Sequence, residues 1–236
     1  MNKSEIARFL ILRSIGNFLL LFAIFGVLAT FGPALYYEVV FGIVQARGVH
    51  YKVESAQTSG FGEILKNKTS QNNSSSEFAN ILSGPKEQIL MPKDTDFDIL
   101  IPKIGANEKV FPNVDASSEK EFLPILAQGV AHARGTVFPG QAGNIYLFAH
   151  STDSFWDVGR YNAVFYLLKN LSAGDDIVVF FQGSRHNYTV TDSKTVDSNE
   201  VSYIVNAQTG KEQLILQTCW PPGTSWKRLL VFAKPK

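Results

Sequence analysis

Apolar and polar positions divide the chain into two parts of different texture. From Ser14 to Tyr37 no residue carries a charge, and most positions are apolar. This run is long enough for a helix that crosses a bilayer, which needs about 20 mainly apolar residues. From Phe97 onward, short apolar runs alternate with polar turns, as is typical of a domain rich in β-strands. The pattern therefore predicts a membrane helix followed, after a gap, by a mainly β domain.

The β-rich part predicts many short strands and little helix. Residues 118–126 are expected to form a helix, because Ser117 or Ser118 can cap it and acidic residues occupy its first turn. A shorter helix is expected over residues 162–168. This set of elements indicates a closed barrel or a sandwich. The expected strands cover residues 98–104, 109–111, 144–149, 176–181, 187–191, 213–218 and 229–233.

The charges that precede the apolar run predict its orientation. Lys3, Arg8 and Arg13 stand against one acid, Glu5. This bias favours a cytoplasmic segment over residues 1–13 and a single pass, with the rest of the chain outside the cell membrane. Two alternatives are a cleaved signal peptide, which needs a shorter apolar core, and a buried core helix, which would carry a polar face.

Residues 38–93 separate the expected membrane helix, residues 14–37, from the expected catalytic domain, residues 94–236. Their middle, from Lys66 to Glu77, is polar and rich in Asn and Ser. Such a segment cannot bury apolar surface and is typical of a flexible tether. We therefore expect an extracytoplasmic linker, and whether it also acts as a lid stays open.

Composition excludes several classes of protein. The chain has 22 Lys and Arg, 21 Asp and Glu, and a net charge of +1, which argues against a protein that wraps nucleic acid with a clustered basic excess. Its single cysteine excludes an internal disulfide and any zinc site with two or more thiolates. No metal site or cofactor is expected. The lone thiol is either an inert core residue or a nucleophile.

Three residues suited to thiol chemistry stand at predicted strand ends. Cys219 comes directly after an apolar strand and before a Pro/Gly loop, His150 ends another strand, and Arg228 begins the last one. A cationic neighbour lowers the pKa of a thiol, an imidazole carries the proton of a leaving group, and a guanidinium holds an oxyanion. A papain-like enzyme would place its cysteine before its histidine, and here the order is reversed. Placement alone leaves two interpretations open: a Cys–His–Arg site, or an inert cysteine.

The segments around these positions resemble the sortase family. An apolar strand ending in Thr218 and Cys219, followed by Arg228 a short loop later, looks like the family's signature. The stretch from Gln128 to His150 is similar to the sortase segment that ends at the catalytic histidine. The resemblance covers the whole β-rich domain.

The resemblance implies an eight-stranded sortase-type β-barrel with short helices, and a cysteine transpeptidase outside the membrane. Carried over by position, Cys219 is the nucleophile, His150 the general acid/base and Arg228 the oxyanion or substrate-positioning group. Thr218 is expected to contribute to substrate binding. His132 matches no catalytic position and is expected to be structural.

The implied reaction is a two-step acyl transfer. A C-terminal, LPxTG-like sorting signal of a secreted protein is cleaved through a thioester, and the acyl group passes to an amine on a cell-wall precursor or a pilin lysine. The subclass, the exact sorting motif and the acceptor stay open. The alternative is a catalytically silent sortase-like module that binds peptides or serves a structural role.

Overall fold

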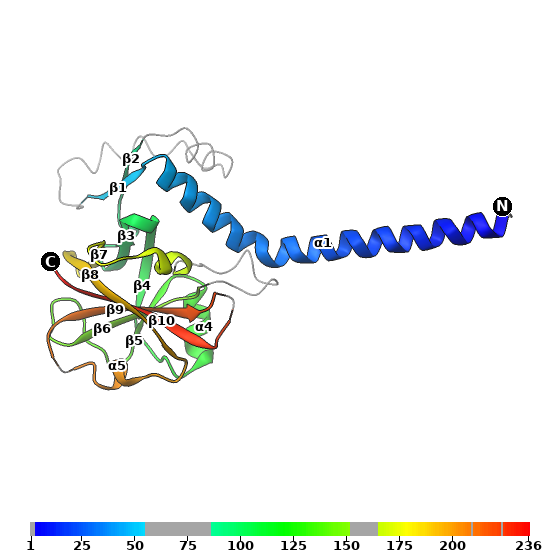
Figure 1. Ribbon diagram of the computed structural model, residues 1–236. Helices are drawn as coiled ribbons and strands as arrows, with labels where there is room; N and C mark the ends of the chain where they lie inside the picture. Colours follow the sequence, from blue (N-terminus) through cyan, green and yellow to red (C-terminus); the bar gives the residue numbers. More distant parts are fainter. Residues whose placement is uncertain (1–2, 55–85, 152–164, 209, 223) are drawn as a thin grey trace.

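A long helix projects from a β-barrel in the computed structural model, which describes residues 3–54, 86–151, 165–208, 210–222 and 224–236 (Figure 1). Helix α1 (Lys3–Ala46) contains the segment Ser4–Leu28, which is long and apolar enough to span a bilayer. The helix continues beyond the expected boundary at residue 37, because an apolar pattern resumes over Leu35–Ala46. Its C-terminal part lies against the barrel.

Eight strands close the barrel in the order β10–β8–β7–β3–β4–β5–β6–β9, which confirms the expected eight-stranded architecture. Most neighbouring strands are antiparallel, while the pairs β4–β5 and β6–β9 are parallel. The barrel strands are β3 (Phe97–Ile101), β4 (Ala106–Val114), β5 (Val130–Ala133), β6 (Asn144–Phe148), β7 (Asp176–Phe181), β8 (Ser184–Asp197), β9 (Gln213–Trp220) and β10 (Lys227–Pro235).

The helices outside α1 are short. Helix α4 (Glu119–Leu126) lies where capping and acidic residues predict it. The strand expected over residues 98–104 ends at Ile101, because Pro102 has no N–H to donate to a ladder and opens the 3-10 turn η1 (Pro102–Ile104). The turn η3 (Tyr166–Asn170) overlaps the helix expected over residues 162–168, whose first residues lie outside the described part. A last single-turn helix is α5 (Ser202–Val205).

Two strands differ from their predicted extent. The pattern does not predict β5, because all four of its residues are buried and the alternation that marks a half-exposed strand is absent. Strand β8 is much longer than residues 187–191, since it pairs along the whole of β10 although most of its side chains are exposed.

Three apolar clusters hold these elements together. The largest fills the barrel and draws alternate residues from every strand, such as Ile99, Leu147 and Leu216. A second lies on the outer face of β5, β6, β9 and β10, under α4 and α5. A third lies on the outer face of β3 and β7, where Leu100 and Val178 pack against Val53 and Leu90.

The segment expected as a linker over residues 38–93 contains ordered elements at both ends. Besides the last turns of α1, it holds β1 (His50–Val53) and β2 (Glu87–Leu90), which form a parallel pair. Their apolar residues are the ones that cover β3 and β7, so this part of the segment packs on the barrel. The polar middle, residues 66–77, lies outside the described residues.

Candidate active site

Strand β9 presents two different faces. Leu214, Leu216 and Thr218 point into the barrel, and the first two belong to its main core. Because side chains alternate along a strand, Cys219 shares the opposite, outer face with Ile215. The only cysteine of the chain therefore lies on the outside of the barrel, where it is partly exposed.

Cys219 and Arg228 are direct partners across the β9–β10 ladder. This corrects the expectation that Cys219 follows the end of its strand: β9 continues through Trp220, which still pairs with Lys227. The Cα atoms of such antiparallel partners lie about 4.5–5.5 Å apart, and their side chains stand on the same face. Strand register, rather than a loop, thus places Arg228 directly opposite Cys219.

His150 reaches the same place from the other neighbour of β9. Strand β6 runs parallel to β9 with Phe148 opposite Gln217, and the Ala149 N–H donates to the Gln217 carbonyl at 3.2 Å. One further step along both strands places His150 beside Cys219. By alternation His150 lies on the outer face with Phe148. Continued past the end of β6, this register predicts one row of Arg228, Cys219 and His150, called the catalytic row here for the role proposed below.

The surroundings of the row set its electrostatics. His150 is half-buried, and this burial lowers the pKa of its imidazole below the ordinary value. The Arg228 guanidinium donates from Nη1 to the carbonyls of Ser225 and Lys227, both at 3.1 Å. These bonds hold the Nη1 end of the guanidinium against Ser225 and Lys227, and the group also carries N–H donors on Nε and Nη2.

A polar pair lies next to the row on the same face, and the sequence motifs do not point to it. The Tyr146 hydroxyl donates to Gln217 Oε1 at 2.7 Å. Burial raises the pKa of Tyr146, and the charge of Arg228 opposes that rise. The pair thus stays neutral beneath the charged row. Tyr146 and Gln217 each stand within an apolar strand and belong to no motif, so the sequence alone does not single them out.

Thr218 lies on the inner face and is almost fully buried. Its hydroxyl donates to the Ala149 carbonyl at 3.1 Å. Thr218 precedes Cys219 and Ala149 precedes His150, so this hydrogen bond links β9 to the residue after β6 on the inner side of the catalytic row. Its expected contact with substrate stays a prediction.

A shallow cleft of about 630 Å³ lies on the far side of β8 from Cys219, and none of the three residues of the row lines it. One of its walls is β8, where Val196 pairs directly with Arg228. The opposite wall is the segment that leads into α5, with Glu200 and Val201.

His132 lies outside the site and is a structural residue, as expected. It is fully buried inside the barrel, where Nδ1 accepts from the Asn113 N–H at 3.3 Å and Nε2 lies 3.1 Å from the Val137 carbonyl. Both ring nitrogens are therefore committed to the protein, and burial lowers the pKa of the ring.

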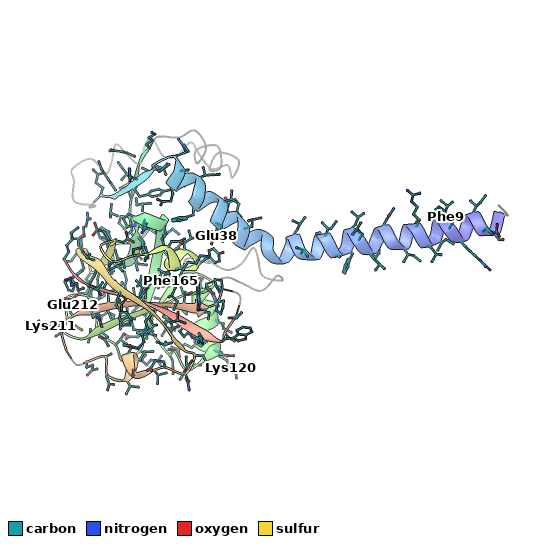
Figure 2. All side chains as sticks on the ribbon, in the orientation of Figure 1. Phe9, Glu38, Lys120, Phe165, Lys211 and Glu212 are labelled. Atoms are coloured by element: carbon teal, nitrogen blue, oxygen red, sulfur yellow. The ribbon has the colours of Figure 1, made fainter. Side chains whose placement is uncertain are left out.

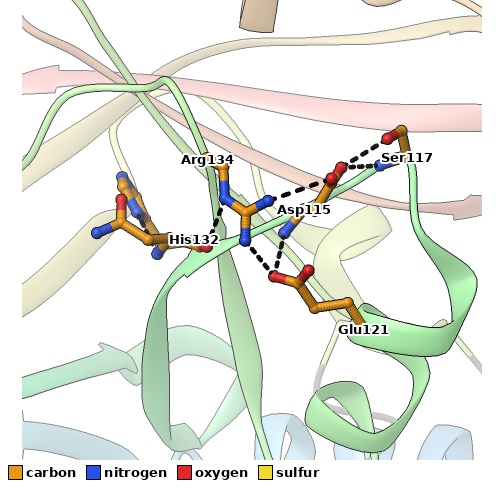
Figure 3. Close-up of polar contacts among 6 residues, drawn as sticks. Asp115, Ser117, Glu121, His132 and Arg134 are labelled. Carbon is orange, nitrogen blue, oxygen red and sulfur yellow. Dashed lines mark hydrogen bonds and ion pairs between the residues drawn. The ribbon is translucent and has the colours of Figure 1, made fainter.

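The residues that follow His132 hold α4 in place (Figure 3). Arg134 donates to Asp115 at 3.2 Å and to Glu121 of α4 at 2.5 Å, and its Nε donates to the Asn113 carbonyl. This cluster fixes the helix over the outer face that carries the catalytic row. Among the residues that the structure describes, no group of three or more His, Cys, Asp or Glu side chains could hold a metal ion.

Comparisons with known proteins find a matching domain family and similar folds. The model of the sortase domain matches residues 99–236. Sortase D of Bacillus subtilis (strain 168) is 29% identical over 137 residues, which cover 57% of this chain and 60% of the relative. The chain thus spans less than two thirds of the length of that relative.

Two solved structures are similar in both fold and sequence. Sortase C-1 from Actinomyces oris has a TM-score of 0.51 and 26% identity over 61% of this chain and 76% of its own. Sortase C2 of Pilus Island 1 from Group B Streptococcus has a TM-score of 0.50 and 25% identity over 59% and 73%.

Proposed function

Because the chain belongs to the sortase family, we propose that it is a membrane-anchored cysteine transpeptidase that uses the catalytic row. The observation that supports this proposal is strand register: Arg228 pairs with Cys219, and the pairing of β6 with β9 ends two residues before His150. Its substrates are secreted proteins with a C-terminal, LPxTG-like sorting signal, and its acceptor is an amine on a cell-wall precursor or a pilin.

In the first step, the Cys219 thiolate attacks the carbonyl carbon of the scissile peptide bond. The oxygen gains negative charge, and Arg228 stabilises it from the next strand. The carbon–nitrogen bond then breaks, and protonated His150 gives its proton to the departing amine. The products of this step are a thioester on Cys219, neutral His150 and the released C-terminal fragment.

In the second step, the acceptor amine attacks the thioester carbonyl. His150 takes the proton that this amine loses, and Cys219 leaves again as a thiolate. The enzyme returns to its starting state, and water competes as an alternative acceptor.

The proposed anchor is the charge-free run from Ser14 to Tyr37 of α1, which overlaps the apolar segment Ser4–Leu28. Arg8 and Arg13, which precede this run, favour a cytoplasmic N-terminus, which places the barrel outside the cell. Protease added to intact cells should digest the barrel, and complete protection would contradict this orientation.

Mass spectrometry tests the proposed chemistry. The full chain is incubated with a library of sorting-signal peptides and an amine, and the intact mass is followed with time. We expect a thioester adduct on Cys219 and an amide product, both absent from Cys219→Ala. Peptide binding without an adduct would support the catalytically silent alternative instead.

A further inference from the structure

Helix α1 holds the barrel at a defined distance from the proposed membrane span. The Tyr37 ring lies 5.7 Å from the ring of Tyr166 in η3, and Glu38 forms an ion pair with Lys169 of the same turn. Figure 2 shows Glu38 on the part of α1 that lies over the barrel, whereas Phe9 lies on the projecting part. Farther along, the Gln45 amide donates to the Lys103 carbonyl at 3.4 Å. The helix is thus docked on the barrel at both turns, η1 and η3.

The distance between span and docking point is short. The apolar segment ends at Leu28, ten positions before Glu38, and the charge-free run ends at Tyr37, so the rise from the span to Glu38 is at most about 15 Å. A headgroup layer is about 5–8 Å thick, and a domain of this size has a radius of gyration of about 14 Å. The barrel therefore reaches the membrane surface. The helix bends along its length (Figure 1), as Pro33 within it favours, but it is continuous through Ala46.

The direction of β9 decides which end of the barrel faces the membrane. Lys211 and Glu212, which directly precede β9, lie at the end of the barrel away from the projecting part of α1 (Figure 2). Strand β9 runs from there toward the side from which α1 projects, and its last residues are Cys219 and Trp220 (Figure 1). The end with the catalytic row thus points toward the bilayer, while the C-terminus lies at the opposite end.

A second, independent observation concerns the connection between β9 and β10 at this end. Trp226 exposes 74% of its surface, and it is followed by the exposed Lys227. Tryptophan is enriched at the membrane–water interface, where its ring sits among headgroups. A lysine beside it matches anionic lipid. An exposed indole at the membrane-facing end therefore fits a lipid surface.

We propose that the β9–β10 connection rests on the lipid headgroup layer, with Trp226 as a second point of membrane contact, so that Cys219 receives its substrates at the membrane surface. This inference rests on the proposed membrane span. It gives the active site a fixed height above the bilayer, and it favours peptides and amines that are themselves tethered to the membrane.

Energy transfer in vesicles tests the proposal with the full chain. The protein is reconstituted in phosphatidylcholine with a minority of phosphatidylglycerol, with acceptor dye on the headgroups and donor dye on Cys219. The control probe is Lys236→Cys in a Cys219→Ala background. Lys236 follows the last residue of β10, whereas Arg228, the partner of Cys219, is near its start. The strand between Arg228 and Pro235 is about 24 Å long, so the two probes are separated by about that distance. We expect at least about twofold greater transfer from Cys219, given that offset.

Two variants examine the contact itself. Trp226→Ser should lower transfer from the Cys219 probe, whereas Val205→Ser should not, although Val205 is equally exposed at 75%. Val205 lies near the start of β6, because the neighbouring Ala207 accepts from the Asn144 N–H. A flexible Gly/Ser insertion after Gly32 combined with Trp226→Ser should make the two probes equal.

The outcomes separate the inference from its premise. If the chain fails to float with the vesicles or is extracted by alkaline carbonate, the proposed span is wrong, and the inference falls with it. If the chain is inserted but both probes transfer equally, or if Trp226→Ser behaves like Val205→Ser, the span stands and the docking is refuted. Transfer between Cys219 probes on different chains, without transfer to lipid, would assign this end to a second copy and also refute it.

Discussion

Two outer faces of the same barrel have different roles. On β3 and β7 the outward residues Leu100 and Val178 are covered by β1 and β2. On β9 and β10, and just past the end of β6, the residues of the proposed catalytic row are only partly buried. Alternation sends side chains outward on both faces, so an outward position does not by itself indicate a site. What differs is whether another part of the chain covers the face.

The difference also appears in the charged groups of the two faces. Asp98 of β3 points outward but is fully buried, and burial raises the pKa of its carboxyl to about 6. Its Oδ2 accepts from the Asp94 N–H at 2.9 Å. On the other face, Arg228 keeps donors available beside a partly exposed thiol. Covering a face immobilises its polar groups, whereas leaving it open makes them available for chemistry.

The largest expected effect concerns the thiol of the open face. Cys219→Ala should abolish acyl-enzyme formation, because the chain has no other cysteine. Cys219→Ser should be almost as inactive, since a hydroxyl is a far weaker nucleophile without a strong base. Intact-mass measurement with a sorting peptide and an amine reads both variants. Transpeptidation by Cys219→Ala would refute the proposed mechanism.

Substitutions of the two histidines, His150 and His132, should affect different quantities: the reaction rate and the stability of the fold. His150→Ala should lower kcat/KM by about 10²–10⁴-fold, because amine expulsion loses its proton donor, with little change in the free energy of unfolding. His132→Ala should instead lower that free energy by about 1–3 kcal/mol for each buried backbone group left without a partner. Peptide-cleavage kinetics and urea unfolding measure the two effects. The assignment fails if the two variants exchange these behaviours.

Arg228→Lys tests whether Arg228 acts through its directed N–H donors or only through its positive charge. The substitution keeps the charge but removes the planar fork of donors. One oxyanion donor is worth about 10²–10³ in rate, so kcat should fall by at least an order of magnitude while the melting temperature stays close to wild type. A matched control is Lys227→Arg, one residue earlier and exposed. A near-normal kcat for Arg228→Lys would show that only the positive charge of Arg228 matters and would contradict its role as an oxyanion donor.

On the covered face, Asp98 makes stability depend on pH. Its folded pKa of about 6 lies above the ordinary value of 3.8, so the buried carboxylate destabilises the fold as pH rises between these values. Asp98→Asn lacks this titration. Relative to wild type, its free energy of unfolding should therefore rise by up to about 3 kcal/mol from pH 4 to pH 7. Urea unfolding at both pH values measures this, with Asp96→Asn as the exposed control. Equal differences at the two pH values would contradict the buried charge.

The smallest effect is expected from substitution of Thr218, on the inner side of the strand that carries Cys219. Thr218→Val keeps the shape but loses the hydrogen bond to the Ala149 carbonyl, which should cost about 1 kcal/mol of stability and less than tenfold in kcat/KM. The kinetic constants decide its role. A fall in kcat at constant KM indicates positioning of His150, and a rise in KM at constant kcat indicates the substrate contact expected from the sequence.

The sequence determined much of this protein by itself. The charge-free run and its basic flank predict a span, and alternating apolar residues predict most strands, because these patterns reflect only whether each residue is buried. The order of Cys219, His150 and Arg228 within family-like segments was enough to select the candidate residues. Residues buried on both faces, as in β5, leave no alternation to read.

Only the tertiary structure decided which strands are neighbours and in what register. Thr218 and Ala149 are 69 residues apart in the chain, and no local pattern predicts that β6 and β9 pair in parallel. The same holds for the docking of α1 and β1 on the barrel, which makes one outer face closed and leaves the other open. Burial preferences are local, whereas pairing is settled by which long-range contacts close the barrel together.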